Sequence, residues 1–128
     1  MTIKEVSEKF GLTQDTLRYY ERAGMIPPVS RNARGVRDYT EEDLKWVGLA
    51  KCMRSAGLSV ETLAEYVRLF REGEETIPAR LALLQQQRNA LMDQQKRIAE
   101  TISRLDFKIS RYENAMETGT LDWNSKGE

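Results

Sequence analysis

Several residue types that support common site chemistries are scarce or missing in this sequence. It contains no histidine, and its single cysteine cannot form a disulfide within the chain. A structural zinc site takes four Cys or His ligands and a catalytic one usually three, so we expect no metal site. The sequence also shows no nucleophile–base pair and no glycine-rich phosphate loop. We therefore expect no catalytic residue, no cofactor and no enzymatic activity.

Long apolar runs and an excess of one charge are missing too. No stretch approaches the roughly 18 apolar residues of a membrane-spanning helix, and the N-terminus lacks the apolar core of a signal peptide. Together with the lone cysteine, this predicts a cytoplasmic protein without membrane contact. The 20 basic and 20 acidic residues balance to zero net charge, which excludes a uniformly cationic DNA binder. Any argument for DNA binding must therefore rest on a local cluster.

Such a cluster lies in residues 12–40. Between Arg18 and Arg37 the chain has five arginines against one acid, Glu21, with tyrosines interleaved. Arginine and tyrosine donate hydrogen bonds to phosphates, and arginine also reads base edges. A short helix followed by a basic hairpin is typical of a winged helix-turn-helix.

Capping signals place the helices around this cluster. Thr2, Thr13, Thr40 and Ser59 are each predicted to cap the N-terminus of a helix. Thr2 and Glu5 also have the spacing of a capping box. The predicted elements are a helix-turn-helix over 2–24, a wing over 29–39, and helices over 41–56 and 59–72. The last of these is expected to bury Leu63, Val67 and Phe70.

A heptad pattern occupies the last third of the chain. One series of positions, spaced alternately by four and three residues, is apolar at ten of its twelve members. We call it the seam: Ile77, Leu81, Leu84, Arg88, Leu91, Gln95, Ile98, Ile102, Leu105, Ile109, Tyr112 and Met116. A helix of this length, about 60 Å, cannot bury its seam on so small a domain. The expected partner is the same helix of a second subunit.

Two seam positions are polar, and their role stays open between two readings. Arg88 and Gln95 either set the register or orientation of the pair or leave a locally wet gap. The sequence thus predicts a mainly α fold, with a winged helix-turn-helix domain over 1–74 and a dimerising coiled-coil helix over 76–117. A tail over 118–128 follows, in which Leu121 and Trp123 either dock on the body or stay disordered.

Three segments together resemble the mercury-resistance-regulator (MerR) family of bacterial transcription regulators. They are IKEVSEKFGLTQDTLRYYERAGMIPP, the pattern R-x-x-R-G-x-R-x-Y, and TEEDLKWVGLAKCMRSAGLSVETL. The resemblance implies a homodimer that binds a pseudo-palindrome in double-stranded promoter DNA. It also implies that the protein bends and underwinds the promoter, which aligns the promoter elements for RNA polymerase.

The resemblance also assigns roles to residues. It places Arg18 in the major groove as a base reader. The predicted DNA-binding residues are Thr13, Gln14, Thr16, Arg18, Tyr19, Tyr20, Arg31, Asn32, Arg34, Arg37, Tyr39 and Arg54. Arg37 and Tyr39 have a second reading, in which they brace the hairpin against the third helix. Arg54 stands where relatives have a lysine, which keeps the charge but changes the geometry.

Cys52 lies two residues before Arg54, and two readings of it remain open. It is either a small apolar residue that fills the core or a sensor thiol made more nucleophilic by Lys51 and Arg54. The resemblance to the lone-cysteine, AdhR/NmlR-like branch favours the sensor. That branch implies a response to aldehydes, other thiol-reactive electrophiles, or oxidative or nitrosative stress.

Two alternatives to thiol sensing are kept. One is a regulator that senses a small apolar ligand beside Trp46, Met53, Tyr66 and Phe70, which are otherwise core residues. The other is a coiled-coil protein-interaction module, whose DNA binding would depend little on salt, unlike that of a regulator.

Overall fold

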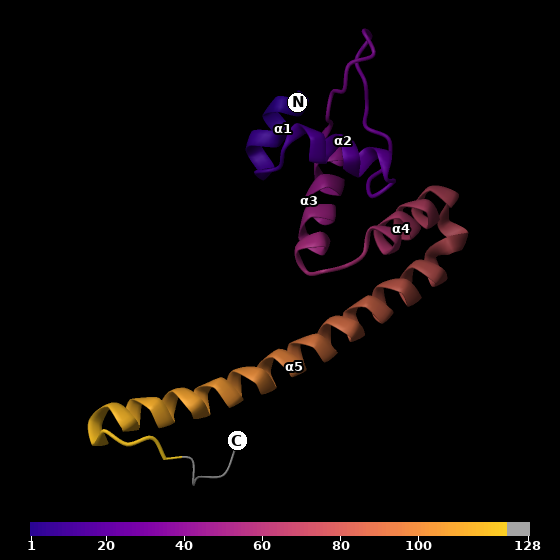
Figure 1. Ribbon diagram of the computed structural model, residues 1–128. Coiled ribbons are helices and arrows are strands. Elements are labelled where there is room, and N and C mark those ends of the chain that lie inside the picture. Colours follow the sequence, from indigo (N-terminus) through magenta and orange to yellow (C-terminus); the bar gives the residue numbers. More distant parts are fainter. Residues whose placement is uncertain (123–128) are drawn as a thin grey trace. The chain divides into compact units, whose positions relative to one another are not determined.

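The computed structural model describes residues 1–122, and Trp123 lies outside the described residues. Helices follow one another in the order α1 (Ile3–Phe10), α2 (Gln14–Arg22), α3 (Glu41–Ser55), α4 (Val60–Glu72), the 3-10 helix η1 (Glu74–Thr76) and α5 (Ile77–Thr118) (Figure 1). The chain divides into unit 1, Met1–Gln87, and unit 2, Arg88–Glu128. The predicted mainly α fold, a helix-turn-helix followed by a long helix, is confirmed.

The four predicted caps are all present. The Thr2 hydroxyl accepts a hydrogen bond from the Glu5 amide while the Glu5 carboxylate accepts one from the Thr2 amide, which completes a capping box. Thr40 and Asp43 form a second capping box at the start of α3. Thr13 and Ser59 cap α2 and α4. These local bonds satisfy amides that would otherwise lack a partner in the first turn of each helix.

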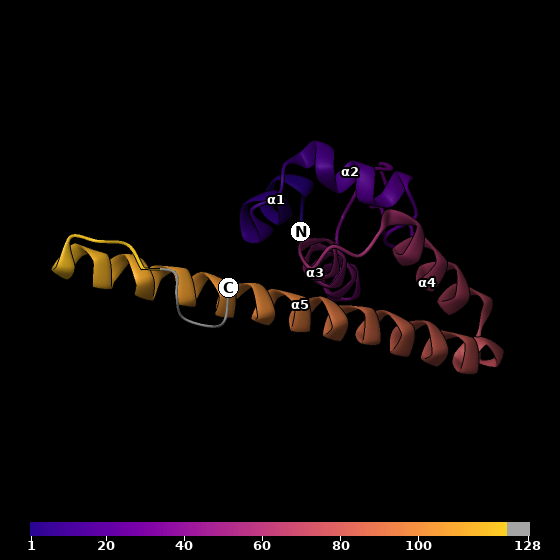
Figure 2. The ribbon, with the colours of Figure 1, turned by 60° about the horizontal axis from the view of Figure 1, so that its bottom comes forward.

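The core of unit 1 forms where α1, α2, α3 and α4 meet. Val6 of α1, Leu17 of α2 and Val47 of α3 are fully buried, and α1 and α2 lie side by side (Figure 2). Met25 and Ile26 are also buried in the segment after α2. Burying side chains of this size contributes about 1.5–3 kcal/mol each, and this core holds the surface of α2 in place.

One expectation about the core is wrong. Leu63 and Val67 are buried as predicted, but Phe70 is 42% exposed. The helical period places all three on one face of α4, yet Phe70 lies in the last turn of that helix, two residues before its end at Glu72. There its ring packs against the Trp46 indole only at an edge, with ring centroids 5.0 Å apart.

Helix α5 has 42 residues, and none of them is buried in the single chain. Ile98, Ile102, Leu105 and Ile109 of the seam are each more than half exposed. Among the described residues, no helix combines the length and the apolar character needed to cross a membrane.

Candidate nucleic-acid interface

The first turn of α2 presents short polar side chains that are already paired with one another. The Thr13 hydroxyl accepts from the Thr16 amide at 3.0 Å and donates to the Thr16 hydroxyl at 2.8 Å. Thr13 therefore holds the N-terminus of α2, and its hydroxyl is engaged in the cap. Gln14 is half-buried and accepts a bond from Arg18.

Arg18 lies on the solvent side of α2 and is tethered only weakly. Its Nη1 is 3.0 Å from Asp15 Oδ1, and the Asp15 side chain is 97% exposed. Exposed pairs of this kind contribute at most about 1 kcal/mol. Arg18 can therefore exchange this carboxylate for a base edge or a phosphate at little cost.

The two adjacent tyrosines of α2 have different environments. Tyr19 is 41% exposed, and the Arg22 guanidinium lies 5.4 Å from its ring centroid. Tyr20 is only 6% exposed and belongs to the core. Its burial raises the pKa of the Tyr20 hydroxyl, an effect that the positive charge of Arg54 opposes. Of these α2 residues, Tyr19 and Arg22 are thus accessible to solvent, whereas Tyr20 is not.

The tip of the wing is organised by Asn32. Asn32 Oδ1 accepts from the amides of Arg34 at 2.9 Å and Val36 at 3.1 Å. The backbone of Asn32 also bonds Val36 and Gly35, and Gly35 has a positive φ of 78°. Asn32 was predicted to contact DNA, but its side-chain oxygen is occupied within the turn. Its geometry is that of a residue that orders the neighbouring arginines.

Arg31 and Arg34 are both exposed on the hairpin. Arg31 Nη1 donates to the Gly35 carbonyl at 2.9 Å, so its guanidinium lies across the turn. The hairpin itself has a single antiparallel bridge, between Arg31 and Arg37. So few ladder bonds cannot hold a hairpin in water, and its order depends on anchors elsewhere.

Two carboxylates from neighbouring helices supply those anchors. Glu21 of α2 accepts the Val29 amide at 3.0 Å with one oxygen and pairs with Arg37 Nε at 2.7 Å with the other. Asp43 of α3, which is buried, accepts the Ser30 amide at 3.2 Å. Asp43 lies at a capping-box position, but nothing in the local sequence indicates that Glu21 holds the wing.

Arg37 and Tyr39 therefore lie on the side of the wing that faces the core of unit 1. The bracing role expected for Arg37 is toward α2, through Glu21, and not toward the third helix. Tyr39 is 2% exposed, and its buried hydroxyl has no hydrogen-bond partner. Burial raises the pKa of the Tyr39 hydroxyl. In the free protein this hydroxyl is not presented to solvent, although Tyr39 was predicted to touch DNA.

The C-terminal end of α3 holds Cys52 and Arg54. Cys52 is exposed in the single chain, so it does not fill the core of unit 1. Lys51, beside it, donates to the Phe10 carbonyl at the end of α1. The Arg54 guanidinium donates to the Leu58 carbonyl, which ties α3 to the segment that leads into α4.

The aromatic group considered as a ligand site is closely packed. The Trp46 ring lies 5.0 Å from that of Phe70 and 6.0 Å from that of Tyr66, measured between centroids. Met53 is partly buried against the same core. These four residues contact one another or the core, which favours their reading as core residues.

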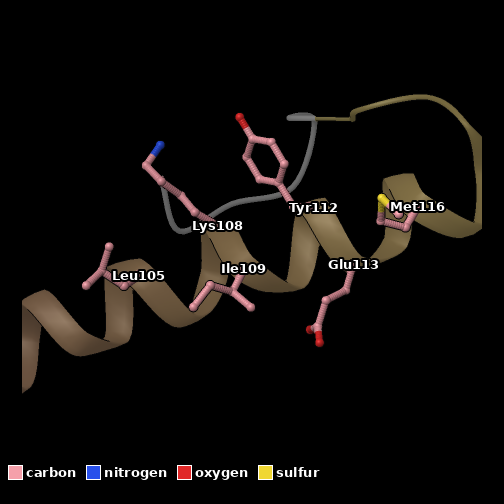
Figure 3. Close-up of a pocket in the computed structure, with 6 residues that line it drawn as sticks. All are labelled: Leu105, Lys108, Ile109, Tyr112, Glu113 and Met116. Atoms are coloured by element: carbon pink, nitrogen blue, oxygen red, sulfur yellow. The ribbon is translucent and has the colours of Figure 1, made fainter.

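The seam forms a groove near the end of α5. A hollow of about 420 Å³ is lined by Leu105, Lys108, Ile109, Tyr112, Glu113 and Met116. Figure 3 shows Leu105, Ile109 and Met116 following one another along the helix. Lys108 and Tyr112 point to one side of this row and Glu113 to the other. The groove thus contains four seam residues, Leu105, Ile109, Tyr112 and Met116, with the charged side chains of Lys108 and Glu113 on either side, as in a helix that packs against another helix.

The chain is similar to known transcription regulators in both sequence and structure. The family model described as MerR HTH family regulatory protein matches residues 1–69. The HTH-type transcriptional regulator AdhR of Bacillus subtilis (strain 168) is 55% identical over 93 residues, which cover 73% of this chain and 66% of that protein.

Two solved structures extend the similarity into α5. One, from Listeria monocytogenes, is provisionally described as a MerR family transcriptional regulator; it is 49% identical with a TM-score of 0.89 and covers 93% of this chain and 90% of its own. The other is HiNmlR, a MerR family regulator lacking the sensor domain, bound to promoter DNA. It is 29% identical with a TM-score of 0.84 and covers 94% of this chain and 95% of its own.

Proposed function

The chain belongs to the MerR family of helix-turn-helix regulatory proteins, and from this premise we propose that it binds a pseudo-palindromic promoter as a homodimer and distorts that DNA to control transcription. The family consists of transcription regulators, so the prediction that the protein is not an enzyme is confirmed. We further propose that RNA polymerase is the partner at the promoter and that the protein acts in the cytoplasm.

The observation that carries the DNA-binding proposal is the separation of charge on α2 and the wing. Arg18, Arg22, Arg31 and Arg34 have solvent-accessible side chains. The one acid among them, Glu21, is half-buried and bound to Arg37. The surface between Arg18 and Arg34 is therefore basic although the whole chain has no net charge, and the exposed acids on either side of it, Asp15 and Asp38, are paired with Arg18 and the N-terminal amine. HiNmlR, which matches nearly the whole chain, was solved on promoter DNA.

The DNA-binding proposal is tested by the salt dependence of affinity. The binding constant for a promoter duplex, measured by fluorescence anisotropy, is expected to fall steeply as salt rises. Arg34→Ala should reduce the slope of log K against log [salt] by about one. Arg71→Ala, which removes an exposed arginine from α4, is the matched control and should keep the slope. An affinity independent of salt would favour the protein-interaction module instead.

The dimer proposal rests on the exposed seam. Ile98, Ile102 and Leu105 follow one another at the spacing of a coiled coil, and each is 51–55% exposed. A contiguous apolar row of this length marks an interaction surface. A second copy supplies a helix of equal length and the same spacing.

Sedimentation of two single variants tests the dimer. Ile102→Asp places a charge in the seam and is expected to yield monomers at micromolar concentration. Ser103→Asp adds the same charge one residue along, outside the seam, and should leave the dimer intact. Equal sedimentation of both variants and the unmodified chain as monomers would refute the proposal.

We also propose that Cys52 senses thiol-reactive electrophiles such as aldehydes. Its exposure makes the thiol accessible in the single chain, and α3 also carries Arg54, which is bonded to Leu58. Addition of the Cys52 thiolate to the carbonyl carbon of an aldehyde forms a C–S bond while the C=O π bond opens, and the oxygen takes the electron pair and then a proton from water. The adduct adds bulk to α3. Such a change beside Arg54 can shift the segment between α3 and α4.

Cys52→Ser separates this proposal from its alternatives. The variant is expected to bind promoter DNA as before but to lose the change in transcription that an electrophile produces in a purified system. A full response in Cys52→Ser would make the thiol irrelevant. The stimulus would then be sought elsewhere, for example in a small apolar ligand.

A further inference from the structure

The joint between α4 and α5 is built around a buried hydroxyl. Helix α4 ends at Glu72 and is followed by the capping residue Gly73, whose φ of 117° favours glycine, and η1 then leads directly into α5. Thr76, the last residue of η1, is only 8% exposed. Its hydroxyl proton is shared between the carbonyls of Leu69 at 2.6 Å and Gly73 at 2.7 Å. The Leu69 carbonyl lies in the last turn of α4, where no helical amide is available, whereas the Gly73 carbonyl follows the helix and also accepts the Thr76 amide at 3.2 Å.

Arg80, from the first turn of α5, completes the joint. Its Nε donates to the Thr76 hydroxyl at 3.0 Å, and its Nη2 donates to the Gly73 carbonyl at 3.1 Å. A cation at the C-terminus of α4 is also favourable to the helix dipole. The two bonds use two nitrogens of one planar guanidinium, a geometry that a lysine ammonium cannot reproduce.

The same guanidinium connects the joint to the core of unit 1. It lies 5.4 Å from the Phe70 ring centroid, and the Phe70 ring meets the Trp46 ring of α3 edge-on. Trp46 is 9% exposed and belongs to the core. An unbroken row of contacts therefore runs from α3 through α4 to the first turn of α5. Phe70 is thus held between Trp46 and Arg80, although it is 42% exposed.

We propose that Arg80, acting through Thr76, is a positioning residue that fixes the angle between α4 and the first turns of α5. This inference rests on the proposed function, because α5 is the helix through which the dimer would join its two DNA-binding units. A fixed angle then gives the dimer a preferred spacing between half-sites. The same contacts would be present if Arg80 and Thr76 only stabilised the end of α4. The test must therefore measure the angle between α4 and α5 as well as the stability of the fold.

The angle is measured without DNA, in dimers formed from doubly labelled chains diluted with an excess of unlabelled chains, so that only the distance within one chain is recorded. Spin labels on Glu61→Cys and Gln86→Cys, in a Cys52→Ser background, report the distance between α4 and the start of α5. Arg80→Lys keeps the charge but loses the fork, and Thr76→Val loses the hydroxyl at nearly constant shape. Both are expected to broaden the distance distribution while far-ultraviolet circular dichroism stays unchanged. Distributions identical to that of the unmodified joint would overturn the proposal.

The consequence for DNA is measured on promoter duplexes whose half-sites are moved apart or together by one base pair. Arg80→Lys is expected to reduce the discrimination between spacings about fivefold, a typical coupling between linked sites. Thr76→Val should reduce the discrimination in the same way, whereas Thr76→Ser, which keeps the hydroxyl, and Arg71→Lys, in the last turn of α4, should retain it. An equal loss of affinity at all spacings would indicate stabilisation only and would overturn the positioning role. If the unmodified dimer bound none of the duplexes, the proposed function would fail, and the distance measurement alone would still decide on the joint.

Discussion

Arg37 Nε lies 2.7 Å from Glu21 Oε1, and both side chains are at least three-quarters removed from solvent. Because the second oxygen of Glu21 accepts the Val29 amide, one carboxylate holds both strands of the wing. The wing is thus attached to α2 through an acid in the middle of the basic cluster. This explains how a negative charge can support a surface that we propose to bind phosphates.

Replacing that acid should therefore weaken the wing and the fold together. Glu21→Gln keeps an acceptor for Val29 but loses the ion pair with Arg37, and we expect a loss of about 1–2 kcal/mol in the free energy of unfolding. Urea unfolding measures this loss. Asp15→Asn breaks the exposed pair with Arg18 and should cost less than about 0.5 kcal/mol. Equal effects of the two variants would contradict the anchoring role.

The turn of the wing depends on Asn32 in a different way. Asn32→Ala removes the acceptor of the Arg34 and Val36 amides, so both amides should exchange with solvent faster. Hydrogen exchange followed by NMR measures this directly. Asn32→Asp retains the oxygen and should preserve the protection of both amides. Unchanged exchange in Asn32→Ala would mean that the turn is held by the backbone alone.

Removing the Tyr39 hydroxyl should increase the free energy of unfolding, whereas Glu21→Gln should decrease it. The hydroxyl is buried without a partner, and leaving such a group unsatisfied costs about 1–3 kcal/mol. Tyr39→Phe is therefore expected to stabilise the free protein, by up to that amount, in thermal or urea unfolding. A promoter-binding assay on the same variant tests the DNA contact predicted for Tyr39. A loss of stability would show that the hydroxyl is bonded in solution.

Alkaline pH should destabilise the fold through Tyr20 and Tyr39. Burial raises the pKa of both hydroxyls, so the folded state holds their protons to higher pH than the unfolded state does. This contribution is fully present below about pH 10, the unfolded value, and is lost as the pH rises through the folded values. Urea unfolding between pH 8 and pH 11 should show the decline, and Tyr39→Phe should make it shallower. A stability that rose with pH in this range would contradict the assignment.

Local features were predicted well from the sequence because their causes are local. The hydroxyls of Thr2, Thr13, Thr40 and Ser59 bond amides three residues away, so spacing alone reveals them. The heptad series likewise indicated one long helix, which α5 confirms.

Features that depend on residues far apart in the sequence could not be predicted from the spacing of residues. Glu21 meets Arg37 across 16 positions, and no pattern in the chain connects them. Periodicity predicted which face of α4 is buried but not how far along the helix the neighbouring elements cover that face, so Phe70 was wrongly predicted to be buried. The exposure of Cys52 was undecided because α3 carries apolar residues on several sides. The DNA-contacting roles of individual residues remain predictions.

The order of elements along the chain also bears on how the protein is made. The residues that form the core of unit 1 all precede Ile77, whereas the exposed seam belongs to α5 and follows them. Translation proceeds from the N-terminus, at about 5–20 residues per second. A nascent chain can therefore close the core of unit 1 before the seam leaves the ribosome. In that order of events the apolar row emerges on a chain whose core has already closed, which shortens the time available for aggregation.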